Sequence, residues 1–392
     1  MNILFMDWGC FGKDGTIKAM EELGHTVYKF AHEDYKLRQS ASFLDAFYEF
    51  VEKYHIDFCF SYNYFPVLAI GCHEKNLKYI SFLYDSPYVM LYSFTLMYPT
   101  NYVFLFDQAE YLKLRQGGLT NIYYMVLPAD TEQIEKLLKQ PFDRERVTSD
   151  ISFMGQLYNE EHNFLDRVTA AGDEYLNGYL RGIMESQKKI SGYNFIEEML
   201  TPDILKRMQD AYPFVPDQTS VESPTYTYAK YFIDRKITSE ERIHILTEIG
   251  KRFPQQCKLF TWNQNTTIEG VKNMGIAEYF HEMPLVFRHS KINLNISLRS
   301  IYTGIPLRCM DIMANRGFLL SNYQSDLAEA FIPGEEYVYY EDTEDLMHKI
   351  DYYLTHEKER LEITENGYQK VVKLHNYKDC FTEIFRICEI QP

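Results

Sequence analysis

Long apolar runs are missing from this 392-residue sequence, although 46% of its residues are hydrophobic. No segment approaches the roughly 20 apolar residues that a membrane-spanning helix needs. The first residues, MNILFMDWGCFG, form an apolar segment with no basic region before it, so we expect no signal peptide. These absences predict a cytoplasmic protein with no membrane span, whose apolar residues form the cores of two α/β domains.

Metal-binding patterns are missing as well. The seven cysteines are scattered, with no CxxC pair and no Cys/His spacing of the kind that zinc sites use. We therefore expect reduced, mostly buried thiols, as in cytoplasmic proteins, and neither a metal site nor a bound cofactor.

Positive charge is scarce: 40 Lys and Arg stand against 56 Asp and Glu, for a net charge of −16. A protein that binds the phosphate backbone of nucleic acid normally carries a basic face, so nucleic acid is not an expected partner. Aromatic residues are plentiful, with 33 Tyr and 27 Phe. Tyrosine-rich clefts suit sugars, although a bias in codon composition produces the same excess.

The first third of the chain alternates short apolar strands with helices. The expected strands are residues 2–6, 25–30, 57–61, 78–83, 102–107 and 122–127. This succession predicts a doubly wound α/β domain. Glycines 9, 12 and 15 follow the first strand, but their spacing is not GxGxxG. A polar stretch, 140–149, predicts a linker, and 172–234 predicts a helical insertion.

The stretch from Asn293 to Gly334 organises the rest of the prediction. A strand is expected to end near Leu298, followed by the loop Arg299–Ile305 and a helix that begins at Pro306 and is closed by Gly317. The loop then lies at the carboxyl end of a strand and the amino end of a helix, where α/β proteins bind anions. Another helix is expected over 238–253, capped by Ser239.

Charged residues in this stretch indicate what the loop binds. Arg308 and Asp311 share one face of the expected helix near its positive end. An acid is favoured there by the helix dipole, whereas an arginine is not. Arg308 therefore suggests an external anion that needs several donors. Arg299 and the loop amides around Gly304 and Ile305 are expected to supply the other donors. The alternative is an ordinary surface Arg–Asp pair.

The order of these residues resembles the CgeB-like (spore maturation) glycosyltransferases, a bacterial branch of the two-domain GT-B nucleotide-sugar transferases. The resemblance rests on Ile305-Pro306-Leu307-Arg308, Asp311, Ala314 and Gly317, on Phe331-Ile332-Pro333-Gly334-Glu335, and on Ser152-Phe153-Met154-Gly155. It extends less tightly to residues before 100. Asp311 replaces the Glu usual in relatives, and Thr303 stands where retaining GT-B enzymes often carry a second acid.

This resemblance implies a GT-B fold, with two Rossmann-like domains facing each other across a cleft. The implied domains are an acceptor-side domain over 1–145, a nucleotide-sugar domain over 146–376, and a helix over 377–392 that returns to the first domain. The implied donor-site residues are Gly155, Ile276, Tyr279, Arg299, Tyr302, Thr303, Gly304, Ile305, Arg308 and Asp311. Gly9, Cys10, Phe11 and Gly12 are implied to line the acceptor side of the cleft, although a plain tight turn is the alternative there.

Asp85 is the candidate general base, because it follows an expected strand and precedes a Ser-Pro turn. A turn or helix-cap aspartate is the alternative. The predicted function is sugar transfer from a nucleotide-diphosphate sugar, with UDP favoured, to a hydroxyl of a glycan or protein, with Arg308 assisting catalysis and no metal ion. The alternatives are a nucleotide-sugar epimerase or hydrolase, or a non-catalytic scaffold of the same fold.

Overall fold

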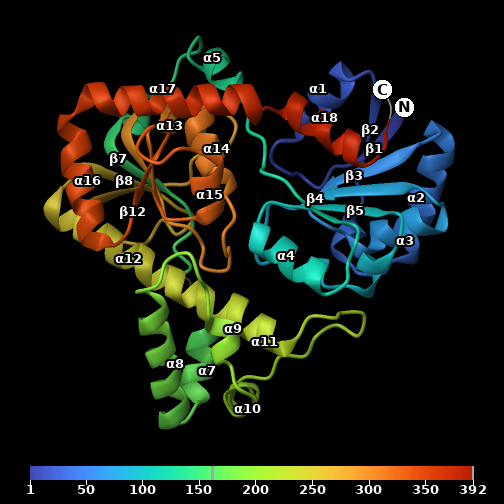
Figure 1. Ribbon diagram of the computed structural model, residues 1–392, viewed down its shortest axis with the longest axis horizontal. Helices are drawn as coiled ribbons and strands as arrows, with labels where there is room; N and C mark the ends of the chain where they lie inside the picture. Colours follow the sequence, from blue (N-terminus) through green and yellow to red (C-terminus); the bar gives the residue numbers. More distant parts are fainter. Residues whose placement is uncertain (160–162, 391–392) are drawn as a thin grey trace. The chain divides into compact units, whose positions relative to one another are not determined.

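The computed structural model describes residues 1–159 and 163–390. Contacts divide the chain into two compact units (Figure 1). Unit 1 comprises Met1–Ala129, Pro216–Glu222 and Leu374–Pro392, and unit 2 comprises Asp130–Val215 and Ser223–Lys373. In the described part of the chain, no helix is both long and apolar enough to cross a membrane.

Unit 1 is built on a parallel sheet of order β2-β1-β3-β4-β5-β6. Its strands are β1 (Asn2–Met6), β2 (Thr26–Phe30), β3 (Phe58–Tyr62), β4 (Lys78–Phe82), β5 (Asn101–Leu105) and β6 (Ile122–Tyr124). Its helices are α1 (Lys13–Glu22), η1 (Glu33–Lys36), α2 (Ala41–Tyr54), α3 (Pro66–Glu74), η2 (Val89–Leu91), η3 (Phe94–Met97), α4 (Gln108–Gln116) and α18 (Tyr377–Ile387).

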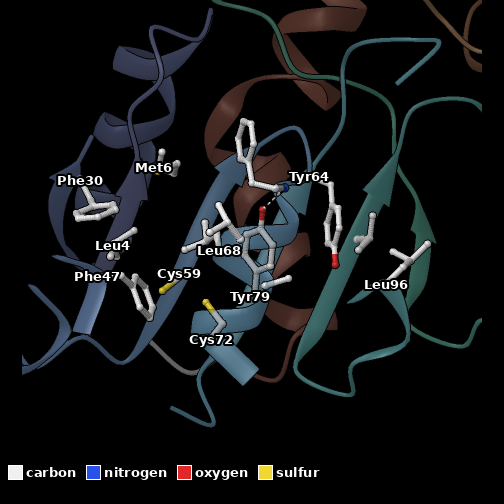
Figure 2. Packing of buried hydrophobic residues seen from close by; sticks show 14 of the residues in the cluster. Leu4, Met6, Phe30, Phe47, Cys59, Tyr64, Leu68, Cys72, Tyr79 and Leu96 are labelled. Atoms are coloured by element: carbon white, nitrogen blue, oxygen red, sulfur yellow. Dashed lines mark hydrogen bonds between the residues drawn. The ribbon is translucent and has the colours of Figure 1, made fainter. Parts of the chain in front are cut away.

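The core of unit 1 is rich in aromatic side chains. Figure 2 shows Cys59 and Cys72 lying between Phe47 and Tyr79, all of them buried. The Tyr79 hydroxyl accepts a hydrogen bond from the Phe65 amide at 3.0 Å, so this buried polar group is satisfied. All seven cysteines are free and buried.

Two later segments complete unit 1. Helix α18 packs on α1, and its Phe385 lies edge-on to His25 and Phe58 with ring centroids 4.9 and 5.7 Å apart. Segment 216–222 is held by an antiparallel bridge from Ser220 to Ser93 and by Arg38, whose guanidinium lies 3.8 Å from the Glu222 carboxylate.

Unit 2 contains a second parallel sheet, of order β12-β11-β10-β7-β8-β9. Its strands are β7 (Ser149–Met154), β8 (Cys257–Phe260), β9 (Val271–Gly275), β10 (Ser290–Asn295), β11 (Leu319–Asn322) and β12 (Val338–Tyr340). Its helices are α5 (Gln133–Leu137), α6 (Arg144–Val147), α7 (Phe164–Ala171), α8 (Glu174–Gln187), α9 (Ile196–Met199), α10 (Pro202–Ala211), α11 (Pro224–Thr227), α12 (Arg235–Arg252), α13 (Met283–His289), α14 (Leu307–Ala314), α15 (Ser325–Ala330), α16 (Thr343–Thr355) and α17 (Glu357–Leu374).

Helices cover the sheet of unit 2 on both sides. Helices α13 and α14 pack against each other on one side of the strands, and α12 and α16 pack against each other on the opposite side (Figure 1). The core between sheet and helices includes Leu246 and Ile249 of α12 and Leu346 and Ile350 of α16. The predicted pair of doubly wound parallel α/β sheets is therefore confirmed.

The region predicted to be a helical insertion, 172–234, contains helices α8 to α11. Helices α7 to α10 form a separate apolar core with the π-helix η4 (Tyr228–Asp234), which continues directly into α12. The prediction that Ser239 caps a helix is wrong, because that helix begins at Arg235 and Ser239 is buried inside it.

Three predictions within the stretch from Asn293 to Gly334 are corrected. Strand β10 ends at Asn295, not near Leu298, and Pro306 precedes helix α14 as its N-cap residue. Gly317 does not supply the left-handed residue after α14, since Arg316 has that conformation at φ 52°. Gly317 is required for close approach instead, because a Cβ there would lie 2.9 Å from the Phe287 carbonyl oxygen.

Candidate functional site

The sheet of unit 2 has a topological switch point between β7 and β10. Strands β8 and β9 extend from β7 in one direction, and β11 and β12 extend from β10 in the other. In open α/β sheets, ligands bind outside the carboxyl ends of the strands at such a point. Here the two strands end at Met154 and Asn295, so the candidate site is built on the residues that follow them.

Arg308 occupies the first turn of α14, next to this switch point. Its Nε atom is buried and donates no hydrogen bond, although the side chain keeps some exposed surface. Burial lowers the pKa of the guanidinium, and the nearby Asp311 carboxylate acts in the opposite direction. Among the described residues no carboxylate lies within ion-pair distance of Arg308. A cation with an unused buried donor is suited to an external anion.

Asp311 lies one helical turn after Arg308 and is 7% exposed. Burial raises the pKa of its carboxyl from 3.8 to about 7, while Arg308 and the Tyr279 hydroxyl lower it. The Tyr279 hydroxyl donates to this carboxyl group, 3.3 Å from each oxygen. The structure thus brings together three predicted site residues, Tyr279, Arg308 and Asp311.

Gly155 follows β7 and faces the same arginine. A Cβ at this position would lie 3.5 Å from Arg308 Nη1 and 3.6 Å from Arg242 Nη1. Arg242, on α12, was not predicted from the sequence. It is one of many charged residues in that helix, and nothing in the local pattern separates it from its exposed neighbours.

The predicted loop 299–305 makes its own set of contacts within unit 2. The Arg299 guanidinium forms a bidentate ion pair with Glu241 and donates to the Ile190 carbonyl at 3.0 Å. The Tyr302 ring lies 3.4 Å from the Lys230 ammonium, and its hydroxyl donates to Glu197. These contacts fix the loop against η4, α9 and α12.

The remaining predicted donor-site residues make their observed hydrogen bonds mainly through backbone carbonyls. The Thr303 carbonyl accepts from the Asp326 amide at 3.1 Å, and the Gly304 carbonyl accepts from the Gln324 side chain at 3.3 Å. Ile305 is fully buried, whereas Ile276 is 40% exposed and its carbonyl accepts from Arg146 at 2.8 Å. Among the described residues, no hydrogen bond joins Ile276 to Arg308.

In unit 1, the predicted residues meet at the carboxyl ends of β1 and β4. The Tyr84 hydroxyl accepts from the Phe11 amide at 3.4 Å, which places the loop Gly9–Gly12 beside the residue before Asp85. Gly9 and Gly12 have positive φ, and Cys10 is buried, with burial raising the pKa of its thiol to about 12. Gly12 also leaves space for the Tyr377 hydroxyl, which a Cβ would approach to 2.5 Å.

Asp85 is fixed by Asn63, whose side-chain amide donates to the carboxylate at 2.6 Å. The surrounding groups desolvate the Asp85 carboxyl and raise its pKa, while the Asn63 hydrogen bond lowers it. A carboxylate with a raised pKa and a fixed orientation has the properties of a general base.

Unit 2 also contains a pocket of about 540 Å³, lined by residues of α8 and α12 and by the ends of β10 to β12. Arg299 and Glu241 form part of its wall. Over residues 1–159 and 163–390, no group of three His, Cys, Asp or Glu side chains is arranged to hold a metal ion.

Comparison with known proteins gives one family match. Residues 234–386 match the glycosyl transferase-like family (Glyco_trans_1_2), a segment that includes α12, β10 and α14. No curated protein sequence matches the chain. The narrower CgeB-like family is not identified by this match and stays a prediction.

Several solved structures share the whole fold at low sequence identity. Sucrose-phosphate synthase from Thermosynechococcus elongatus aligns with a TM-score of 0.56 and 10% identity over 99% of this chain and 98% of its own. Anabaena Alr3699/HepE in complex with UDP-glucose aligns with a TM-score of 0.52 and 11% sequence identity over 99% of both chains. Trehalose-6-phosphate synthase OtsA aligns with a TM-score of 0.52 and 12% sequence identity over 98% of this chain and 99% of its own. The chain therefore has the GT-B fold, and its residues 234–386 match the glycosyl transferase-like family.

Proposed function

We propose that the protein transfers a sugar from a nucleotide-diphosphate sugar to a hydroxyl group of a glycan or protein. The observation that carries this proposal is Arg308, a cation with an unused buried donor, placed beside Gly155 and Asp311 at the switch point of unit 2. A diphosphate supplies the anion that this arrangement lacks.

The chemistry of sugar transfer explains why such a cation is needed. The departing diphosphate gains negative charge as the glycosidic bond breaks, and a preorganised donor stabilises this charge in the transition state. Arg308 supplies the compensating positive charge from the protein, so the proposal invokes no metal ion and no cofactor. Asp311 accepts from the ribose hydroxyls, with Tyr279 already orienting its carboxylate.

The other predicted donor contacts belong to this proposal. The loop of Arg299, Tyr302, Thr303, Gly304 and Ile305 leads into α14, and we place the diphosphate and the transferred sugar against it. Ile276 is proposed to contact the base. UDP is the favoured nucleotide because one similar GT-B structure, Anabaena HepE, is a complex with UDP-glucose.

The acceptor is proposed to bind unit 1 near Gly9, Cys10, Phe11 and Gly12. Asp85 is the proposed base that removes the proton of the acceptor hydroxyl, since its raised pKa keeps it basic and Asn63 fixes its orientation.

A donor screen tests the function. UDP, GDP and their sugars are added to the purified protein, and the expected result is a rise in melting temperature with a UDP-sugar by mass action. The binding donor is then incubated with candidate glycans and peptides, and transfer is followed by mass spectrometry. Release of free sugar without an acceptor would identify a hydrolase instead, and no binding of any nucleotide sugar would contradict the proposal.

A further inference from the structure

Arg242 is a buried charged group beside the candidate site. It is 8% exposed, and its guanidinium lies over the rings of Phe153 and Tyr158, 5.5 and 5.3 Å from their centroids. No carboxylate among the described residues lies within ion-pair distance of it. A buried cation without an acid is costly unless its donors are satisfied in another way.

Backbone carbonyls satisfy these donors. Arg242 Nη1 donates to the Gln156 carbonyl, and its Nε and Nη2 both donate to the Ile296 carbonyl, with Nε at 3.1 Å. Gln156 lies two residues after β7, and Ile296 directly follows β10. One guanidinium therefore joins the ends of the two strands that form the switch point.

The same face of α12 fixes the loop that follows β10. The Thr238 hydroxyl accepts from the Arg299 amide at 2.9 Å, and Glu241 holds the Arg299 side chain. Thr238, Glu241 and Arg242 are spaced as neighbours on one helix face. Helix α12 thus determines the path of residues 296–299, which lead toward the amino end of α14.

Arg242 and Arg308 approach each other across Gly155. Their Nη1 atoms lie 3.6 and 3.5 Å from the position that a Gly155 Cβ would occupy. The positive charge of Arg308 contributes to lowering the pKa of Arg242, after burial itself. Each nitrogen of Arg242 already donates to a backbone carbonyl, whereas Arg308 has a buried nitrogen, Nε, that donates to no group.

We infer that Arg242 is a positioning residue for the nucleoside diphosphate: it locks the ends of β7 and β10 together, so that Gly155 and Arg308 form one anion-binding surface. This inference rests on the proposed function and assigns a role to a residue outside the predicted donor set. The positive charge of Arg242 adds to the attraction for the diphosphate without direct contact.

Substitution at Arg242 tests this role. Arg242→Gln and Arg242→Lys are compared with Arg252→Gln, a control in the last turn of the same helix whose guanidinium pairs with Asp351 at the surface. We expect kcat/KM, expressed per folded molecule, to fall about 10²-fold in Arg242→Gln because the reacting groups are displaced. The lysine ammonium lacks the planar, forked donors with which the guanidinium binds the carbonyls of Gln156 and Ile296, so Arg242→Lys should also lose activity.

Nucleotide affinity separates positioning from stability. UDP is the probe, and its dissociation constant should rise in both Arg242 variants and stay unchanged in Arg252→Gln. A lower melting temperature with unchanged UDP affinity and unchanged kcat/KM per folded molecule would overturn the inference and leave the proposed function intact. Failure of the unmodified protein to bind UDP or any other nucleotide would overturn the proposed function, and this inference with it.

A measurement on the unmodified protein covers the case in which the variants do not fold. Hydrogen exchange of the arginine Nε–H groups is followed by NMR with and without UDP. The Arg242 proton should exchange slowly in both states, and the Arg308 proton should become protected only with UDP. Fast exchange of the Arg242 proton, or protection of Arg308 already complete without UDP, would contradict the inference.

Discussion

Arg308 and Asp311 lie one turn apart on α14, but we expect their loss to affect different steps. Arg308→Ala should lower kcat about 10²- to 10³-fold, because it removes a donor that acts on the departing diphosphate. Asp311→Ala should mainly raise the dissociation constant of the donor sugar. Steady-state kinetics and calorimetry with UDP-sugar measure both effects. Arg207→Ala, at an exposed ion pair of α10, is the control and should change neither. Equal, negligible effects of the first two substitutions would falsify the site.

Ionisation of Asp311 should also make stability depend on pH. Its pKa rises from 3.8 in the unfolded chain to about 7 in the folded protein, so between these values the folded state binds more protons. Stability contributed by this group therefore decreases as pH rises through that window, and the loss is complete above about pH 7.

The neutral variant Asp311→Asn lacks this dependence and can still accept a hydrogen bond from Tyr279. We expect its stability relative to the unmodified protein to increase from pH 5 to pH 7.5 and then to level off. Urea unfolding at several pH values measures this difference. A difference that stays constant over the range would show that Asp311 is ionised in the folded protein throughout.

Among elements, the contact between the end of α12 and the start of β9 depends on two glycines. A Cβ on Gly250 would lie 2.0 Å from the Glu269 carbonyl oxygen, and a Cβ on Gly270 would lie 2.1 Å from the Gly250 carbonyl oxygen. Two backbone segments pack directly against each other here. The atoms that a Cβ would meet belong to the backbone, so they cannot move aside as the end of a flexible side chain can.

Gly250→Ala should therefore lower the free energy of unfolding by about 3 kcal/mol or more, since the backbone must shift to admit the methyl group. Gly178→Ala is the matched control, because Gly178 is an exposed helical glycine of α8 with no atom within 4 Å of its Cβ position. Alanine there should stabilise the protein by about 0.5–1 kcal/mol. Chemical denaturation of both variants gives the comparison, and a tolerated Gly250→Ala would show that α12 can move away from β9.

Much of this element pattern could be predicted from the sequence, and the exceptions have physical reasons. Short runs of apolar residues predicted the strands of the first sheet, because most residues of β1, β3, β4 and β5 are buried. The start of α12 was missed because the π-helix η4 runs directly into it and no capping residue marks the boundary. Lys230 and Asp234 form a buried ion pair within η4. Arg242 was missed because its partners are backbone carbonyls, which leave no mark in the sequence.

At the scale of the whole molecule, unit 1 depends on its third segment, Leu374–Pro392. Phe385→Ala removes a ring that is 5% exposed and packs on His25 and Phe58. The expected loss is about 3–5 kcal/mol in the stability of unit 1. Leu374→Ala, at a half-exposed side chain, is the control and should change stability by less than about 0.5 kcal/mol. Hydrogen exchange in β1 and β3 measures the effect, and unchanged protection there would show that α18 does not support the sheet.

The division of unit 1 into three separate segments has a consequence for synthesis on the ribosome. All residues of unit 2 have been made once Lys373 has been added, whereas unit 1 still lacks α18 at that stage. The amino-terminal unit is thus the last to be completed, against the usual order in which domains fold as they emerge. Until α18 has emerged from the ribosome, the apolar surface around Phe58 and His25 has no covering helix.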